Sequence, residues 1–176
     1  TADTPILENI QAADLRVARP TEPEFLLHYS CGADSSPTDY APLEASLEKG
    51  SKRAFAPNGG RPTNGAWPYY NLQWGDRGAI LAIGWGGQWA SEFTRDEQRS
   101  LRFVAGQQLT HFTLHPGEQA QAPRIIMQFW KGGDWIGAQN VWRRWMKAHN
   151  MPHPGGNLPK PMLLSYTGRF YEEMAK

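Results

Sequence analysis

The chain has 176 residues and a formal net charge of +1, so it is long enough to bury the core of one ordinary domain. The near-neutral charge argues against electrostatic attraction to nucleic acid or to an anionic membrane surface, and no apolar run is long enough to span a bilayer. A single cysteine, Cys31, excludes a disulfide within these residues and a zinc site built from cysteines.

Aromatic residues are abundant, with eight Trp, seven Phe and six Tyr. Burying a large aromatic side chain stabilises a fold by about 2–3 kcal/mol before its entropy is counted, so these residues can build a strong core. The same rings also stack well on sugars. For any single Trp, a place in the core is the favoured interpretation.

Short apolar runs separated by Gly, Pro, Asn and Asp fill residues 6–130. β-Branched and aromatic residues enrich the first runs that predict strands, which are 24–29, 67–74 and 79–85. The sequence Gly-Asp-Arg-Gly at 75–78 predicts a hairpin that joins the last two.

Three later segments also predict strands. Residues 101–104 and 109–114 alternate apolar and polar side chains, as half-buried strands do. The run 124–130 is more apolar and predicts a strand in the centre of a sheet. Strands at this spacing without helices between them predict a mainly β fold, an antiparallel β-sandwich.

The pattern changes to a helical one after residue 133. Asp134 can cap a helix that continues to about His149. Its apolar residues recur at helical spacing, at Trp135, Trp142, Trp145, Met146 and His149. Basic residues near its C-terminal end suit the helix dipole, namely Arg143, Arg144 and Lys147. A basic membrane-surface helix is the alternative, but a packed helix with solvated basic residues is favoured.

The segment after the helix is typical of a linker, with two prolines and two glycines within 151–156. Residues 161–166 predict one more strand, and another apolar element begins at 170–174. The expected organisation is therefore a sandwich over 1–133, a linker helix over 134–150, and a linker with the start of a further domain over 151–176.

No pair of carboxylates stands out as an acid–base pair. The acidic residues are scattered through predicted turns and caps, and the adjacent Glu172 and Glu173 would face apart. The five histidines show no metal-ligand motif. We therefore predict no catalytic residue, no metal and no cofactor in this chain.

Two stretches carry groups that suit sugar binding. Residues 59–70 place a guanidinium, Arg61, an amide, Asn64, and several aromatics on one loop, although a turn before a core strand explains them equally well. Residues 84–90 place Trp85 and Trp89 around a Gly-Gly turn, where they would form a sugar platform or pin two sheets together.

An ordered series of segments resembles the N-terminal β-supersandwich region of the α-galactosidases of glycoside hydrolase family 36. The series covers the chain from about Ile6 to its end, and each segment is short. It consists of Arg61-Pro62-Thr63-Asn64-Gly65 before Pro68-Tyr69-Tyr70-Asn71-Leu72, then Ala82-Ile83-Gly84-Trp85 with Gly87-Gln88-Trp89, then 109–118, Pro123 to Trp130, Trp142-Arg143-Arg144-Trp145, and Leu163 to Phe170.

The resemblance implies a β-supersandwich, a linker helix and the first strand of a truncated (β/α)₈ barrel. Retaining hydrolysis of a terminal α-galactoside is the implied reaction, with both catalytic aspartates after Lys176. The sandwich would then support the barrel, help the protein to form homo-oligomers and close one wall of the galactoside pocket. The implied substrate-binding residues are Asp34, Asp39 and Arg61, and the Trp platform adds Trp89.

Two alternatives remain open at this point. One is an independent lectin-like sandwich that binds glycans through Trp67, Trp85 or Trp89. The other is an interaction module without a sugar site. In the favoured interpretation the expected partner is an α-galactoside or a related oligosaccharide, which the full-length protein binds. Neither nucleic acid nor a membrane is expected as a partner.

Overall fold

The computed structural model describes residues 2–18 and 24–160. The chain divides into two compact units, Thr1–Trp142 and Arg143–Lys176. The first unit contains every strand of the described residues together with the first half of the helix. The division into 1–133, 134–150 and 151–176 stays a prediction, and the strand predicted at 161–166 lies outside the described residues.

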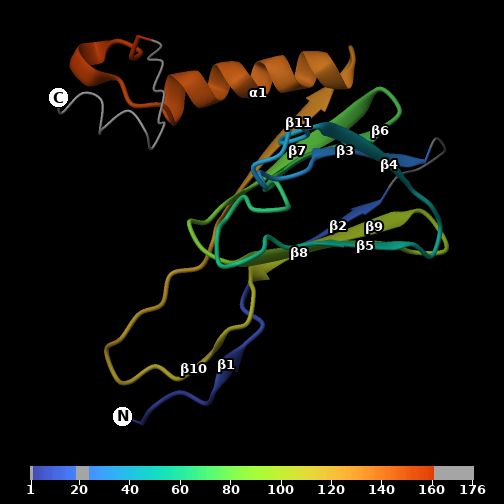
Figure 1. The fold of residues 1–176 in the computed structure, drawn as a ribbon. Coiled ribbons are helices and arrows are strands. Elements are labelled where there is room, and N and C mark those ends of the chain that lie inside the picture. The colour runs from blue at the N-terminus through green and yellow to red at the C-terminus, as the bar shows by residue number, and fades with distance from the viewer. Residues whose placement is uncertain (1, 19–23, 161–176) are drawn as a thin grey trace. The chain divides into compact units, whose positions relative to one another are not determined.

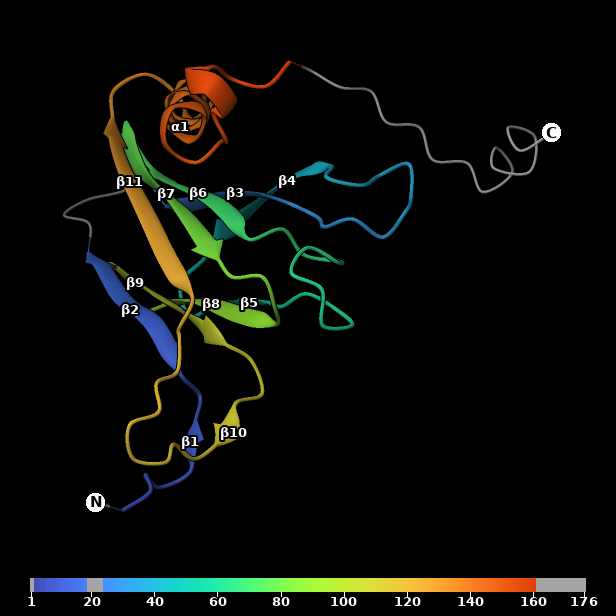
Figure 2. The ribbon, with the colours of Figure 1, turned by 90° about the vertical axis from the view of Figure 1, so that its left-hand side faces the viewer.

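The first unit is an antiparallel β-sandwich, which confirms the predicted fold class (Figure 1; Figure 2). One sheet has the strand order β11-β7-β6-β3-β4 and the other has the order β2-β9-β8-β5. The strands of the first sheet are β3 (Phe25–Ser30), β4 (Pro42–Leu47), β6 (Tyr69–Trp74), β7 (Arg77–Gly84) and β11 (Arg124–Lys131). Those of the second are β2 (Gln11–Ala18), β5 (Lys52–Phe55), β8 (Trp89–Arg95) and β9 (Ser100–Gln107).

A third, two-stranded ribbon pairs β1 (Leu7–Glu8) with β10 (His111–Phe112) beside the sandwich. The prediction of a longer half-buried strand at 109–114 is therefore wrong. Leu109 is 89% exposed with a φ of 57°, which is not a strand conformation. The alternation in this segment has no covered sheet face to bury it, because its partner β1 is only two residues long.

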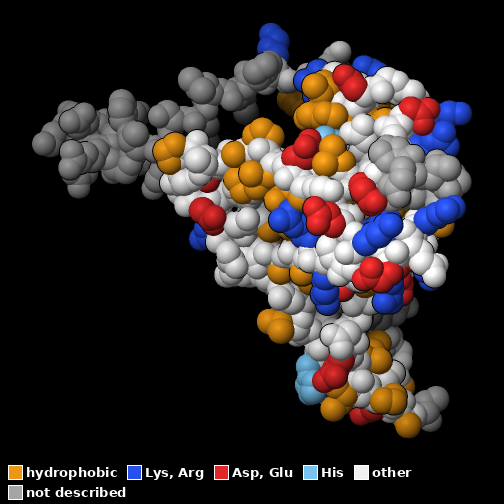
Figure 3. Space-filling view, turned by 90° about the vertical axis from the view of Figure 1, so that its right-hand side faces the viewer, with side chains coloured by type: hydrophobic (Ala, Val, Ile, Leu, Met, Phe, Trp, Pro, Cys, Tyr) orange, Lys and Arg blue, Asp and Glu red, His pale blue; other side chains and the backbone are white. Residues whose placement is uncertain are grey.

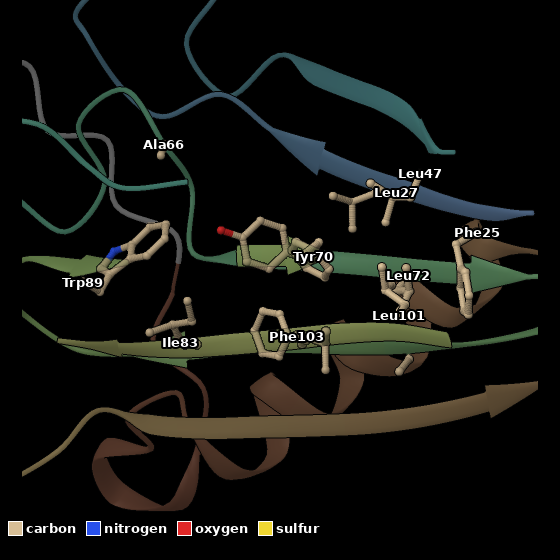
Figure 4. Packing of buried hydrophobic residues seen from close by; sticks show 14 residues of the cluster. Phe25, Leu27, Leu47, Ala66, Tyr70, Leu72, Ile83, Trp89, Leu101 and Phe103 are labelled. Atoms are coloured by element: carbon tan, nitrogen blue, oxygen red, sulfur yellow. The ribbon is translucent and has the colours of Figure 1, made fainter. Parts of the chain in front are cut away.

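The core lies between the two sheets, and Figure 4 shows it from close by. Residues of β3, β6 and β7 supply one side and residues of β8 and β9 the other. The largest fully buried side chains of this cluster are Trp89, Tyr70, Phe25, Phe93, Phe103, Leu27, Leu47, Leu72 and Leu101. The hairpin predicted at 75–78 is confirmed, since β6 and β7 pair antiparallel with Trp74 opposite Arg77.

Strand β7 is buried on both faces. Leu81 and Ile83 point into the core, while Ile80 and Ala82 lie on the opposite face at 3% and 2% exposure. The N-terminal half of the helix α1 (Trp135–His149) lies over this second face (Figure 1). Strands covered on both faces read as continuous apolar runs, which explains the sequence of β7.

Strand β11, predicted to be central, is instead the edge strand beside β7. Phe129 is 68% exposed and Met127 is 41% exposed. The run is apolar because its residues alternate between the core side, opposite Leu81 and Ala79, and the helix side, where Trp130 packs closely on Gly78. Apolar contact therefore accounts for Ile125, which packs against the core, and for Trp130, whereas the edge position leaves Met127 and Phe129 exposed.

The predicted helix is confirmed, and its cap is present. Asp134 Oδ1 accepts a hydrogen bond of 2.7 Å from the Gly137 amide, which otherwise has no partner in the first turn. In the predicted apolar stripe, Trp135, Trp142, Trp145 and Met146 are half-buried and His149 is exposed. Among the described residues no helix has both the length and the apolar character required to cross a bilayer.

The outer face of the four-stranded sheet is polar and carries cross-strand ion pairs. Arg102 contacts Asp14 at 2.7 Å between β9 and β2, and Lys52 contacts Glu92 at 2.6 Å between β5 and β8. Figure 3, which looks at the side of the molecule on the right of Figure 1, likewise shows basic and acidic side chains interspersed. Exposed pairs of this kind contribute about 0–1 kcal/mol each, so they specify the solvent side of the sheet more than they stabilise it.

Candidate functional site

Three loops meet at one end of the sandwich: residues 31–41 between β3 and β4, residues 56–68 between β5 and β6, and residues 85–88 between β7 and β8. We call them the end loops. Cys31 forms an isolated bridge with Ala66, and the Ala33 amide donates to the Thr63 carbonyl at 2.8 Å. Gly32 permits this approach, because a Cβ there would lie 2.2 Å from the Thr63 oxygen.

Gln88 ties the third end loop to the second. Its Oε1 accepts from the Gly60 amide at 2.9 Å, and its Nε2 donates to the Pro57 carbonyl and to Gln108 Oε1. The glycine-rich turn that precedes Arg61 is thereby attached to the rigid start of β8. Gly59 and Gly60 both have positive φ there, 63° and 73°, which glycine adopts without strain.

Asp39 organises its own loop. Its carboxylate accepts backbone hydrogen bonds from Asp34 at 2.8 Å and from Ser35 and Ser36 at 3.1 Å each. These bonds, the one from Asp34 first, hold the pKa of Asp39 below its ordinary value. The loop contains two non-glycine residues in the left-handed region, Ser35 and Tyr40, and the Asp39 carboxylate supports that conformation.

Asp34 is exposed at the contact between the first two end loops. With its amide nitrogen turned toward this loop, Asn64 donates to Asp34 Oδ1 at 3.1 Å and to the Ala33 carbonyl at 2.7 Å. Arg61 follows the glycine turn of the second loop, and its side chain is also exposed. The structure thus places Asp34 and Arg61 on loops that are directly hydrogen-bonded to each other.

Trp89 lies beneath the end loops instead of on their surface. Its side chain is 0% exposed, and its Nε1 donates to the Pro62 carbonyl at 2.7 Å. Figure 4 shows it in the core, at the end where Ala66 lies. A stacking platform needs a ring face open to solvent, so Trp89 supports the second loop and we leave it out of the candidate site. Trp85 is half-buried against the same core.

Aromatic side chains other than Trp85 and Trp89 lie at the surface of this end of the sandwich. Tyr40 is 50% exposed and packs edge-on against Trp67, with 4.9 Å between ring centroids. Trp67 in turn stacks on Tyr69 at 5.5 Å, and burial raises the pKa of Tyr69. Tyr40 was not among the predicted substrate-binding residues, although it follows Asp39 directly in the chain. The signal available in the sequence was an aromatic residue, Tyr40, followed by Ala41 and Pro42.

The candidate site therefore consists of Asp34, Arg61, Asn64, Tyr40 and Trp67, with Asp39 and Gln88 holding the loops in place. A carboxylate, a guanidinium and an amide offer hydrogen-bond acceptors and donors for hydroxyl groups, and the ring edges offer apolar contact. Within the described residues no group of three or more His, Cys, Asp or Glu side chains is placed to hold a metal ion.

Comparison with known proteins supports the fold. No family model and no curated protein matches the chain. Among the solved structures that match is the galactosidase domain of alpha-galactosidase-sucrose kinase, AgaSK, with a TM-score of 0.60 and 19% sequence identity. The match covers 70% of this chain and 17% of that chain. The predicted likeness to a galactosidase domain is confirmed at the level of the fold, and this chain spans a small part of the length of that protein.

Proposed function

We propose that the chain is the β-sandwich part of a larger α-galactosidase-like retaining glycoside hydrolase. The observation that carries the proposal is the match in fold to a galactosidase domain over 70% of this chain. In this proposal the sandwich is not catalytic, and the catalytic aspartates belong to a barrel outside these residues. The sandwich supports that barrel and takes part in homo-oligomer formation, and neither nucleic acid nor membrane is a partner.

The end loops are the proposed contribution to substrate binding. They form one wall of the galactoside pocket, with Asp34 and Arg61 hydrogen-bonded to sugar hydroxyls and Asp39 fixing the loop that carries Asp34. The backbone bonds between the two loops support this role, because ligand groups on tethered loops lose little entropy on binding. The proposed ligand is an α-galactoside or a related oligosaccharide.

The first test measures catalysis in two proteins. The purified chain is expected to release no nitrophenol from a nitrophenyl α-galactoside above the blank. In the full-length protein, Asp34→Ala and Arg61→Ala should each raise KM about tenfold, since a hydrogen bond to a charged group contributes about 1.5–3 kcal/mol.

Asp76→Ala is the matched control, because it removes an exposed carboxylate from the β6–β7 turn at the opposite end of the sheet. Turnover by the purified chain would refute the non-catalytic role. An unchanged KM in both end-loop variants would refute the pocket wall while leaving the role of the sandwich as a support.

A lectin-like sandwich is the second candidate, and the half-exposed Tyr40 packed on Trp67 favours it. This candidate requires the isolated chain to bind galactosides saturably, which is measured as a change in tryptophan fluorescence during titration. Tyr40→Ala should abolish that change. A flat titration of the isolated chain leaves the hydrolase proposal in place and eliminates this candidate.

A further inference from the structure

The second end loop contains both Asn-Gly pairs of the chain, Asn58-Gly59 and Asn64-Gly65. An asparagine before a glycine can react with its own main chain, because glycine has no Cβ to keep its nitrogen away from the asparagine side chain. The proposed function does not use Asn58, although Asn58 begins the turn that leads to Arg61. The two pairs share the reactive residues, so their surroundings decide which pair reacts.

The reaction passes through a succinimide ring. The glycine nitrogen bonds to Cγ of the asparagine, the Cγ–Nδ2 bond breaks, and ammonia leaves with the proton that the glycine nitrogen gave up. Water then adds to one of the two ring carbonyls and returns a proton to the glycine nitrogen. Opening at the side-chain carbonyl leaves aspartate, whereas opening at the main-chain carbonyl leaves isoaspartate. Water is the only co-reactant, and nothing is oxidised or reduced.

Asn58 and Gly59 lie in an exposed turn that holds neither reacting group. Among the described residues, the Asn58 side-chain amide and the Gly59 nitrogen have no hydrogen-bond partner. A Cβ on Gly59 or on Gly60 would meet nothing within 4 Å beyond its chain neighbours. The turn closes through a long bond, from the Arg61 amide to the Asn58 carbonyl at 3.4 Å. The local rearrangement that the reaction requires therefore costs little here.

The pair Asn64-Gly65 is held at both reacting groups. The Asn64 side-chain nitrogen donates to Asp34 Oδ1 at 3.1 Å and to the Ala33 carbonyl at 2.7 Å. The Gly65 nitrogen packs against the first end loop, where a Cβ on Gly32 would lie 2.7 Å from it. Reaction at Asn64 would break two hydrogen bonds, one of them to a carboxylate, and that carboxylate would repel the glycine nitrogen once it is deprotonated.

We propose that Asn58 is a site of spontaneous covalent modification, where the side-chain amide is lost and isoaspartate or aspartate is formed. The fold protects Asn64 from the same reaction. The modification is independent of the proposed function, because it requires no galactoside and no catalytic domain.

Isoaspartate lengthens the turn, because the main chain then runs through Cβ and Cγ of residue 58. The Gly60 amide donates to Gln88 Oε1 at 2.9 Å, and this bond should be lost when the chain before it lengthens. The turn that precedes Arg61 is then no longer attached to the start of β8. The aspartate product keeps the ordinary main chain and should leave the bond in place.

The most direct test incubates the purified chain at mildly alkaline pH, folded in buffer and unfolded in urea, and maps its peptides by mass spectrometry. In the folded chain, residue 58 should change from amide to carboxylate about tenfold faster than residue 64, because Asn64 must first break its hydrogen bonds. In urea the two rates should become similar. Equal rates in the folded chain, or an intact Asn58 there after the urea sample has fully reacted, would overturn the proposal.

Asn58→Gln is the matched variant. It keeps an exposed amide, but its longer side chain would have to close a larger ring, so conversion at residue 58 should stop while Asn64 reacts at its wild-type rate. The isoaspartate product is detected as methyl transfer from S-adenosylmethionine by an isoaspartate carboxyl methyltransferase. Equal methylation of incubated wild type and incubated Asn58→Gln would show that the isoaspartate forms elsewhere and would overturn the assignment.

Amide hydrogen exchange tests the effect on the turn. The Gly60 amide should exchange about tenfold faster in the isoaspartate form than in fresh protein, because it has lost its bond to Gln88. Asn58→Asp is the control for charge, since it has the carboxylate on an ordinary main chain and should exchange like fresh protein. Equal exchange in the isoaspartate form and in Asn58→Asp would overturn the release of the turn.

Discussion

Polar side chains inside the sandwich are paired with partners of matching geometry. The Tyr70 hydroxyl reaches Ser91 Oγ at 2.8 Å between the two sheets, and burial raises the pKa of Tyr70.

Arg95 is 1% exposed, donates to Asp96 Oδ1 at 2.8 Å and to the Gln98 carbonyl at 2.9 Å, and lies over the Phe25 ring. Among the described residues its Nε finds no acceptor. Backbone bonds, that from the Ser100 amide first, lower the pKa of Asp96 to about 2.

We expect Tyr70→Phe to lower the free energy of unfolding by about 1–2 kcal/mol, because it leaves the Ser91 hydroxyl buried without a partner. The double variant Tyr70→Phe/Ser91→Ala should lose less than the sum of the single variants, since it removes both members of the pair. Urea unfolding of the four proteins measures this coupling. Strict additivity would show that the hydrogen bond contributes nothing to stability.

The strands and the helix of this fold differ in how clearly their own sequences predict them. Strand β8 was not predicted, although its burial alternates regularly. Two of its four inward residues are polar, Ser91 and Arg95, so the apolar alternation that signals a half-buried strand is broken. Strand β7 and the helix α1 were predicted, because a continuous apolar run and a capping aspartate are local signals.

Replacing the helix cap tests one of these local signals. Asp134→Ala should cost about 1 kcal/mol of unfolding free energy, because the Gly137 amide loses its acceptor. Exchange of the Gly137 amide should become faster at the same time. Asp76→Ala serves as the control, since Asp76 lies in a hairpin turn and caps no helix. Equal unfolding midpoints for wild type and Asp134→Ala would contradict a stabilising cap.

At the scale of the first unit, aromatic side chains join the two sheets. Phe93 of β8 meets Tyr70 of β6 at 5.1 Å, Phe103 of β9 at 4.8 Å and Phe55 of β5 at 6.1 Å between centroids. Such tilted and edge-on pairs add to the burial of apolar area. The Phe93–Tyr70 pair crosses from one sheet to the other, and the other two pairs connect neighbouring strands of the four-stranded sheet. The chain's many aromatics are therefore used largely for packing, and Tyr40 and Trp67 remain near the surface of the candidate site.

Phe93→Ala should destabilise the fold by about 3–5 kcal/mol, because the cavity would lie between both sheets where neighbours cannot collapse without separating from their strands. The matched control is Phe129→Ala on the edge strand β11, which is 68% exposed and should change stability by less than about 0.5 kcal/mol. Thermal and urea unfolding measure both. Similar losses in the two variants would contradict the assigned core.

Local interactions were readable in the amino-acid sequence alone. The strands at 25–30, 69–74 and 77–84, the two-residue hairpin and the capped helix depend on side chains and turns a few residues apart. The choice of Asp34 and Arg61 as substrate-binding residues followed from the resemblance to a family and stays a prediction, and the structure shows that their loops are hydrogen-bonded to each other.

The order of the strands and the burial of individual side chains depend on contacts between distant residues, so only the tertiary structure decided them. Strand β11 became an edge strand, Trp89 became part of the core, and His28 acquired acceptors from β4 and β6. Neither sheet order nor burial is determined by neighbouring residues, because each results from pairings that close long loops and compete across the whole chain. The sequence therefore indicated the helix and several of the strands, and packing decided the order of the strands and which of their side chains remain available for binding.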